Sequence, residues 1–331
     1  MKKAAALLLL IALIFCFAAC APTEKTAYGF AMGSDYCVTY TSSDDLDGAI
    51  STILSSIEKK YSLQVASSLA VAINQAAAGE SISLDAENYA VFSRVFSIAQ
   101  ISNYAFDPSI LPLVKAWGFD PPYNMNGKVP PVAAVIANAM AASSCEDFTL
   151  NASSITKLRD SACLDLGGAL KGYAAERVAK LMGEKGVDQA LVYIGGTIAA
   201  VGKNYLIGVT PPRKSKESYA LSFTLAKGEI CATSGDYERY YEYENVRYHH
   251  IIDGKTGAPA SSGVISATVI SQDGLLADAL ATAAVVLGVD QALALFDECG
   301  VKGILITSDK KVIAQGVSVA VKDKSYEIRT A

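Results

Sequence analysis

Two polar residues stand four positions apart in an otherwise apolar stretch near the C-terminal end of the sequence. Asp278 and Thr282 lie in the run Ala-Asp-Ala-Leu-Ala-Thr, and on a helix this spacing places both side chains on one face. A carboxylate among Ala and Leu needs a partner, because an unpaired buried charge is costly. Oxygen ligands of this kind suit Mg²⁺, which usually binds one or two carboxylates together with substrate phosphates. The pattern indicates either a Mg²⁺ site or an Asp278 that only caps a helix.

A second segment, Asp165 to Tyr173, carries two glycines and then a lysine at the expected start of a helix. Free N–H groups at such a start, with Lys171 one turn further on, suit a phosphate group. Gly167 and Gly168 allow a ligand to approach the backbone closely. The spacing of a Walker A loop, G-x-x-x-x-G-K-[ST], is absent. An ordinary glycine-marked turn with a solvated lysine also explains the segment.

Two further segments combine aromatic or imidazole rings with other polar groups. His249 and His250 precede a glycine-rich turn, and an imidazole can act as an acid, a base or a hydrogen-bond donor to phosphate. Phe106 and Asp107 precede a proline-rich stretch, where the ring could stack on a planar ligand and the carboxylate could accept its N–H groups. A solvated hairpin and a loop anchor are the structural alternatives for these two segments.

The elements that must position these residues follow from the spacing of apolar side chains. Three- and four-residue steps predict helices at 44–60, 88–104, 169–185, 275–287 and 290–299. Alternation and turn residues predict strands at 36–41, 190–194, 205–209, 219–225, 264–271, 303–307 and 312–315. The prolines at 108, 112, 121 and 122 predict a long irregular segment. Strands joined by short turns favour antiparallel pairing with helices on one side, so the expected class is α+β, an antiparallel-sheet-rich core with flanking helices.

The composition limits the classes of function. The chain has 331 residues, 51% hydrophobic and 18% charged, with a formal net charge of −5, which is ordinary for a globular protein with a large core. An acidic balance without a basic cluster argues against nucleic acid as the main partner. The two histidines are adjacent, which excludes a His-rich metal site. The cysteines after Cys20 form no C-x-x-C motif, so neither a disulfide framework nor a zinc site is indicated, and most are expected to be buried apolar residues.

The N-terminus carries a targeting signal. Lys2 and Lys3 precede an apolar run from Ala4 to Ala19, which is short for a membrane-spanning helix of about 20 residues and ends in small residues. Phe-Ala-Ala-Cys, which ends at Cys20, is similar to a bacterial lipobox, in which the cysteine is diacylated. The alternative is plain signal cleavage after Ala19 with a free cysteine.

The predicted organisation is therefore a lipoprotein signal peptide at 1–19, a lipidated cysteine with a polar tether at 20–27, and one domain over 28–331. The expected location is exported, lipid-anchored to the outer face of the cell membrane.

The segments, in their order and spacing, resemble the ApbE family of FAD:protein FMN transferases from about Tyr28 to about Tyr326. The matching motifs are Met32-Gly33-Ser34 with M-G-T; Ser62, Ser68 and Asn74 with S-x-Y-x-x-x-S-x-x-x-x-x-N; Ala105–Pro108 with A-F-D-P; Asp165–Tyr173 with D-L-G-G-x-x-K-G-Y; Thr233–Tyr237 with T-S-G-D-Y; His249–Asp253 with H-H-I-I-D; and Ala277–Thr282 with A-D-A-L-A-T. Each motif is modest, whereas the ordered set is specific. The resemblance implies a T-fold-like structure with FAD between a sheet-rich core and flanking helices.

The resemblance also implies roles for single residues. Mg²⁺ would be bound by the Asp278 carboxylate, the Thr282 hydroxyl and the backbone carbonyl of Gly168, and His250 would lie near the reacting phosphate as the candidate base. FAD would be held by Met32, Ala105, Phe106, Asp107, Asp165, Lys171 and the backbone near Ile252. The implied reaction is Mg²⁺-dependent transfer of FMN from FAD to a Ser or Thr hydroxyl of an exported or membrane redox protein, with release of AMP.

Some residues depart from the family pattern. Gln64 stands where the family usually places an aromatic residue against the flavin, and Ala281 replaces an acidic residue that some members have beside the metal-binding threonine. The Asp278 and Thr282 pair is intact, so we expect activity with weaker flavin binding. Two other functions stay open. One is a hydrolase that releases FMN and AMP. The other is a flavin-binding lipoprotein without transfer, and Gln64 and Ala281 favour this second alternative.

Overall fold

A computed structural model of the chain describes residues 22–121 and 125–329. Its centre is a nine-stranded sheet. The strands follow in the order β1 (Thr23–Ala31), β2 (Ser34–Ser42), β6 (Ala190–Ile194), β7 (Thr197–Val201), β10 (Ile230–Gly235), β15 (Val264–Ser271), β16 (Lys302–Thr307), β17 (Lys311–Gln315) and β19 (Glu327–Ile328). Neighbours are antiparallel except for the parallel pair β17 and β19. This confirms the expected antiparallel core.

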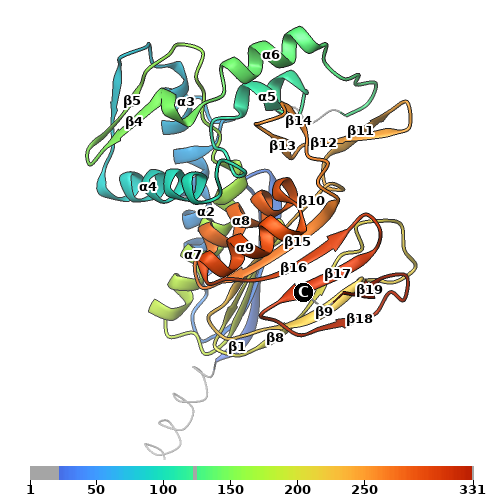
Figure 1. Ribbon diagram of the computed structural model, residues 1–331. Coiled ribbons are helices and arrows are strands. Elements are labelled where there is room, and N and C mark those ends of the chain that lie inside the picture. The colour runs from blue at the N-terminus through green and yellow to red at the C-terminus, as the bar shows by residue number, and fades with distance from the viewer. Residues whose placement is uncertain (1–21, 122–124, 330–331) are drawn as a thin grey trace, which may run out of the picture.

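Helices pack on one face of this sheet (Figure 1). They are α2 (Asp47–Tyr61), α4 (Ala86–Ile101), α7 (Gly167–Glu184), α8 (Gly274–Leu287) and α9 (Val289–Cys299). Their apolar sides and one face of the strands form a single buried cluster, to which Phe92, Val192, Leu280 and Phe296 belong. Because side chains alternate across a strand, every second residue of each strand faces the other way.

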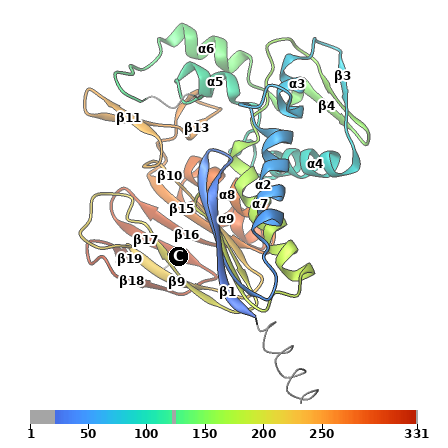
Figure 2. The ribbon, with the colours of Figure 1, turned by 180° about the vertical axis from the view of Figure 1, so that it is seen from behind.

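A three-stranded sheet covers part of that other face (Figures 1 and 2). Its order is β18 (Val319–Val321), β9 (Leu221–Leu225) and β8 (Tyr205–Val209). Phe223 of β9 packs in a second buried cluster with Cys231 of β10 and Ile304 of β16. The molecule therefore has three layers, helices on a large sheet on a small sheet.

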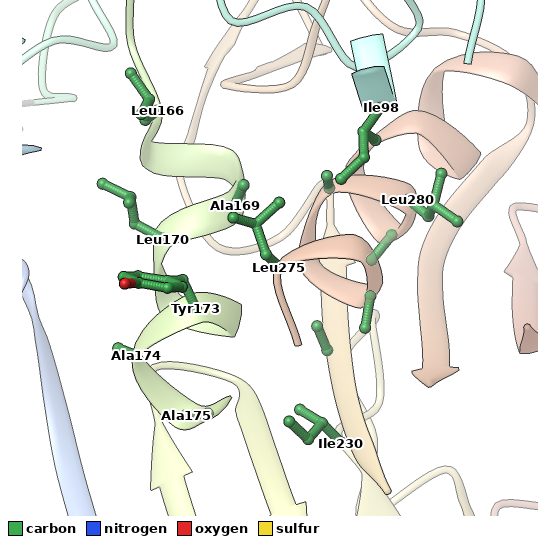
Figure 3. Close-up of a cluster of buried hydrophobic side chains, with 14 of the residues drawn as sticks. Ile98, Leu166, Ala169, Leu170, Tyr173, Ala174, Ala175, Ile230, Leu275 and Leu280 are labelled. Atoms are coloured by element: carbon green, nitrogen blue, oxygen red, sulfur yellow. The ribbon is translucent and has the colours of Figure 1, made fainter. Parts of the chain in front are cut away.

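Two glycines allow α7 and α8 to lie unusually close together. A Cβ atom added to Gly172 would lie 1.9 Å from the carbonyl oxygen of Gly274, and one added to Gly274 would lie 2.3 Å from the carbonyl oxygen of Gly172. Figure 3 shows apolar residues of the two helices, with Ala169 of α7 and Leu275 of α8 between them. The close packing brings α8 beside the N-terminal half of α7.

A further group of short elements lies at the upper end of the sheet in Figures 1 and 2. It comprises α3 (Leu69–Gln75), β3 (Ser81–Ser83), α5 (Leu111–Ala116), α6 (Ala133–Ala141), β4 (Phe148–Asn151), β5 (Ser154–Lys157), β11 (Tyr240–Tyr243), β12 (Val246–His249), β13 (Ile252–Asp253) and β14 (Ala258–Pro259). Stacked rings fix the β11–β12 hairpin to α5. The ring centroids are 5.5 Å apart for Trp117 and Tyr248, 5.4 Å for Tyr248 and Tyr241, and 5.6 Å for Tyr241 and Phe119.

The predicted helices and strands are all found, with ends shifted by at most three residues. Strands β1, β7 and β10 were not predicted. The predicted tether over 20–27 is wrong for Thr23–Ala27, because these residues pair in full register with β2 and Ala27 is buried. The predicted signal peptide at 1–19 and Cys20 lie outside the described residues. No helix among the described residues is long and apolar enough to cross a membrane.

Two smaller expectations also need correction. The proline-rich segment is not wholly irregular, since it contains α5 with Pro112 in its first turn, where a missing N–H leaves no intrahelical bond unmade. The cysteines are less buried than expected. Cys145 and Cys231 are buried, Cys37 is exposed, and Cys163 and Cys299 are partly exposed, because alternation on a strand, not residue type, decides the orientation of Cys37.

Candidate functional site

A cavity of about 650 Å³ lies between the large sheet, the start of α7 and the upper elements. Every site residue predicted from the sequence lines it: Met32, Ala105, Phe106, Asp107, Asp165, Gly168, Lys171, His250, Ile252, Asp278 and Thr282. Gln64 lines the same cavity. The structure thus brings together residues from distant parts of the chain. Their individual roles stay predictions.

One corner of the cavity is rich in oxygen atoms. Asp278 is only 3% exposed, and its Oδ2 accepts a hydrogen bond of 2.9 Å from the backbone N–H of Gly172. Burial raises the pKa of Asp278, whereas the charge of Lys171, whose Nζ lies 4.0 Å from Oδ2, opposes this rise. Thr282 follows one turn later on α8, and its Oγ1 lies 3.2 Å from Oγ of Ser234.

The backbone at Gly168 lies close to side chains from two other parts of the chain. A Cβ atom there would lie 3.2 Å from the ring of Phe106 and 3.6 Å from Oγ1 of Thr282. The start of α7 therefore lies against the polar face of α8 at this point. Phe106 is 3% exposed, so its ring forms part of the cavity wall behind Gly168.

The donor atoms in this corner fit Mg²⁺. They are one buried carboxylate, one hydroxyl and the backbone at the start of α7, all of them hard oxygen ligands if the carbonyl of Gly168 takes part. No group of three or more His, Cys, Asp or Glu side chains suited to a metal ion occurs among residues 22–121 and 125–329. A cation held here would therefore take the Asp278 carboxylate as a ligand and would depend on phosphate oxygens for further ligands.

Asp107 is held in one orientation by three hydrogen bonds to its Oδ1. The donors are the backbone N–H of Ser109 at 2.8 Å, the Ser109 hydroxyl at 2.6 Å and the Cys145 thiol at 3.2 Å. Burial, reinforced by the charge of Asp107, raises the pKa of the Cys145 thiol and keeps it protonated. Because Oδ1 is fully engaged, Oδ2 is the oxygen available to a ligand, and it points toward Gly254.

Asp165 and Lys171 form the polar wall beside the α7 start. Oδ1 of Asp165 accepts a hydrogen bond of 2.8 Å from the N–H of Gly167. Burial raises the pKa of Asp165, and the positive charges of Arg239 and Lys171 oppose the rise. Lys171 therefore interacts with the carboxylates of both Asp165 and Asp278, and its position suits a bound phosphate.

The two adjacent histidines have different environments. Nδ1 of His250 lies 3.2 Å from the carbonyl oxygen of Arg239, which suits an Nδ1–H donor and leaves Nε2 as an acceptor. Burial, and next the charge of Arg239, lowers the pKa of His250 to about 3, so the imidazole is neutral at physiological pH. His249 instead is buried, with Nε2 at 2.9 Å from the Ala260 carbonyl, and it does not line the cavity.

Some cavity residues were missed by the sequence-based prediction. Ser234 touches Thr282, and the run Thr-Ser-Gly-Asp-Tyr was the available signal. Glu58 of α2 accepts a hydrogen bond of 3.2 Å from the backbone N–H of Met32, which has φ +55° in a tight turn with Gly33. Only the fold reveals Glu58, because a glutamate on a helix surface carries no local signal.

Comparison with known proteins identifies the family. The ApbE family model matches residues 32–305. An FAD:protein FMN transferase of Treponema pallidum (strain Nichols) is 32% identical over 286 residues, which cover 80% of this chain and 77% of that protein. One of Klebsiella pneumoniae (strain 342) is 28% identical over 316 residues, covering 92% and 98%.

Solved structures show the same fold. The flavin transferase ApbE from Vibrio cholerae has a TM-score of 0.78 at 25% identity, covering 91% of this chain and 97% of that one. The ApbE protein from Thermotoga maritima has a TM-score of 0.77 at 28% identity, covering 91% and 98%. Because the family model spans most of the sequence and the fold agrees over the same length, this chain belongs to the ApbE family.

Proposed function

We propose that this protein is a transferase that moves FMN from FAD to a hydroxyl side chain of another protein and releases AMP. Membership of the ApbE family supports the reaction class. The observation that carries the proposal is the convergence of Asp278, Thr282 and Gly168 beside Lys171 in one large cavity. That corner suits the pyrophosphate of a dinucleotide, because it offers oxygen ligands that would hold a cation and a lysine that would neutralise phosphate charge.

In this proposal Mg²⁺ would be held by the Asp278 carboxylate, the Thr282 hydroxyl and the carbonyl of Gly168. When bound, it supplies Lewis-acid neutralisation of charge on the phosphate oxygens. Ser234 positions Thr282 through the contact between the two hydroxyl groups. Lys171 binds the phosphate group, and Asp165 limits the conformations of the Gly167 backbone beside it.

His250 is the proposed base. Its Nε2 is an unprotonated acceptor at neutral pH, because Nδ1 is engaged by a backbone carbonyl and the pKa is low. The acceptor hydroxyl gives its proton to Nε2 while its oxygen forms a bond to the phosphorus of the FMN phosphate. The bond between that phosphorus and the oxygen of the AMP phosphate breaks, and AMP leaves with the electron pair.

We also propose that the enzyme acts on the outer side of the cell membrane, where lipid on Cys20 would anchor it, and that residues 28–331 form the catalytic domain. Strand β1 begins at Thr23 and ends at Ala31, beside the cavity. At about 3.3 Å per residue it spans roughly 30 Å. The strand would therefore hold the cavity at about that height above the anchor, within reach of a Ser or Thr in an exported or membrane redox protein.

The test uses the soluble form that begins at Ala21, with FAD, Mg²⁺ and an exported redox protein that carries a Ser/Thr flavinylation segment. We expect the acceptor to gain the mass of one FMN while AMP is released, and we expect Asp278→Ala to abolish both products and calorimetric Mg²⁺ binding. Asp290→Ala, an exposed acid at the start of α9, is the matched control. AMP release that is equally fast without acceptor would identify a hydrolase instead, and FAD binding with neither product would identify a binding protein.

A further inference from the structure

Part of the large sheet is left uncovered next to the cavity. The three-stranded sheet packs on the strands from β7 to β17 and reaches Leu191 of β6, whereas the same face of β1 and β2 carries exposed side chains. Tyr28 is 81% exposed, Phe30 is 70% exposed, and Cys37 is also exposed. Tyr193 of β6, at 39%, continues the set. We call these four residues the β1 shelf.

The strand register shows that the shelf is continuous. Tyr28 is paired with Cys37, Cys37 with Tyr193, and Tyr193 with Ile198. Directly paired residues lie on the same face of a sheet, so this row crosses from the sheet edge toward β7. Ile198 and Tyr193 line the cavity, and so does Phe30. The row therefore leads from the outer edge of the sheet into the candidate site.

The backbone of β1 also offers hydrogen bonds at that edge. Met32 and Gly33 have φ of +55° and +73°, as in the tight turn that joins two paired strands. Ala31 and Ser34 close this turn, and closing residues exchange backbone hydrogen bonds. Because such pairs alternate along an antiparallel ladder, the N–H and C=O groups of Tyr28 and Phe30 point away from β2. Among the described residues, no strand pairs with that side of β1.

We propose that the Ser- or Thr-containing segment of the acceptor protein binds in an extended conformation along the edge of β1, with apolar side chains on the β1 shelf. The inference rests on the proposed transferase function, which requires a polypeptide to reach the cavity from outside. Backbone pairing supplies affinity without sequence demands, and alternate side chains supply specificity. The bound segment then passes Phe30 and places its hydroxyl in the cavity.

This arrangement implies a chemical preference in the acceptor. Residues at alternate positions before the hydroxyl should be apolar, because they lie beside the exposed Tyr28 and Phe30 of the neighbouring strand. The edge of β1 contains no proline and no bulge between Thr23 and Ala31, so nothing in the strand itself blocks pairing.

The test compares Tyr28→Ser with Tyr28→Phe and with Leu206→Ser, a control at a 73% exposed apolar residue on β8 outside the shelf. Tyr28 does not line the cavity. The probe is a synthetic peptide that spans the flavinylation segment of the acceptor protein. We expect Tyr28→Ser to raise KM for the peptide about tenfold, a change of about 1.4 kcal/mol, with kcat at saturating peptide and FAD affinity unchanged. Tyr28→Phe and Leu206→Ser should behave as wild type, and equal unfolding midpoints confirm folding.

A wild-type KM in Tyr28→Ser would overturn the shelf proposal while leaving the transferase intact. If wild-type protein cleaves FAD without labelling the acceptor, the transferase proposal fails. Peptide binding to the β1 shelf can then still be measured by the fluorescence anisotropy of a labelled peptide. Equal binding by wild type and Tyr28→Ser, or no binding, overturns it. The shelf proposal is also overturned if the shelf does not bind the peptide but binds anionic lipid vesicles, or if it binds a second copy of the chain, as sedimentation would show.

Discussion

Gly172 carries the contact that joins the two halves of the candidate metal site, and its replacement by alanine tests the geometry directly. The added Cβ would lie 1.9 Å from the Gly274 carbonyl oxygen and 2.7 Å from Cβ of Asp278. Neither neighbour is the free end of a flexible side chain, so α7 and α8 must separate by about 1 Å or more to restore ordinary contact distances. Gly172 also donates its N–H to Asp278, so the separation would displace the carboxylate.

The expected magnitude follows from these distances. Overpacking of a well-packed core typically costs about 1–3 kcal/mol, and we expect the upper end, about 3 kcal/mol, because two backbones collide. A misplacement of about 1 Å can reduce a catalytic rate about 10²-fold. Gly172→Ala should therefore lower both the free energy of unfolding and the rate of FMN transfer.

The assay measures urea unfolding and transfer rate for Gly172→Ala and for Gly183→Ala. Gly183 lies in the same helix, and an added Cβ there meets no atom within 4 Å. This control should gain about 0.5–1 kcal/mol, because alanine is favoured over glycine inside a helix. If both variants were equally stable and equally active, the close approach of α7 and α8 would be wrong, and with it the assembly of the metal corner.

Three further predictions concern buried polar groups. Because the pKa of His250 is lowered to about 3, the transfer rate should not fall between pH 6.5 and 5 through its protonation, and His250→Gln should lower kcat at least about 10²-fold. Below about pH 6.5 the unfolded chain takes up a proton at His250 that the folded protein does not. The free energy of unfolding of the wild type should therefore fall by about 1.4 kcal/mol per pH unit more than that of His250→Gln. Urea unfolding at several pH values measures this difference. The hydroxyl of Tyr241 has no partner among the described residues, whereas that of Tyr61 donates at 2.6 Å to an asparagine. Tyr241→Phe should therefore leave the free energy of unfolding unchanged or raise it, whereas Tyr61→Phe should lower it by about 1–3 kcal/mol. Iodoacetamide should label exposed Cys37 in the folded protein and leave Cys145 unlabelled, since burial and a raised pKa disfavour its thiolate. Equal labelling in a peptide map would contradict the environment described for Cys145.

Much of the fold could be predicted because its signals are local. The helices around Asp278 and Lys171 follow from apolar spacing, and the strand at 264–271 follows from its composition and bounding turns. Strand β1 was missed because half of its side chains are exposed and polar or aromatic. Its strand conformation depends on pairing with β2, which apolar periodicity in the segment itself does not report.

The candidate site likewise has features that a local pattern predicts and features that depend on tertiary structure. The shared face of Asp278 and Thr282 is a property of one helix, so the spacing alone predicted it. That this face lies against the start of α7 was implied only by the family resemblance, since Gly172 and Asp278 are separated by 106 positions. The distinction between the two histidines is also tertiary, because burial and the nearby Arg239 depend on how β10 and β12 are placed.

The sequence by itself determined the element types, the chemistry of each motif and the family, because these reside in short-range spacing and in the order of motifs. The tertiary structure alone decided the distances between motifs, the neutral state of His250, the partners of Asp107 and the open edge beside the cavity. The physical reason is that burial, pKa shifts and close contacts come from atoms that chain folding brings together across long sequence separations. No local pattern encodes those distances, whereas a Gly pair such as Gly172 and Gly274 permits them once the helices meet.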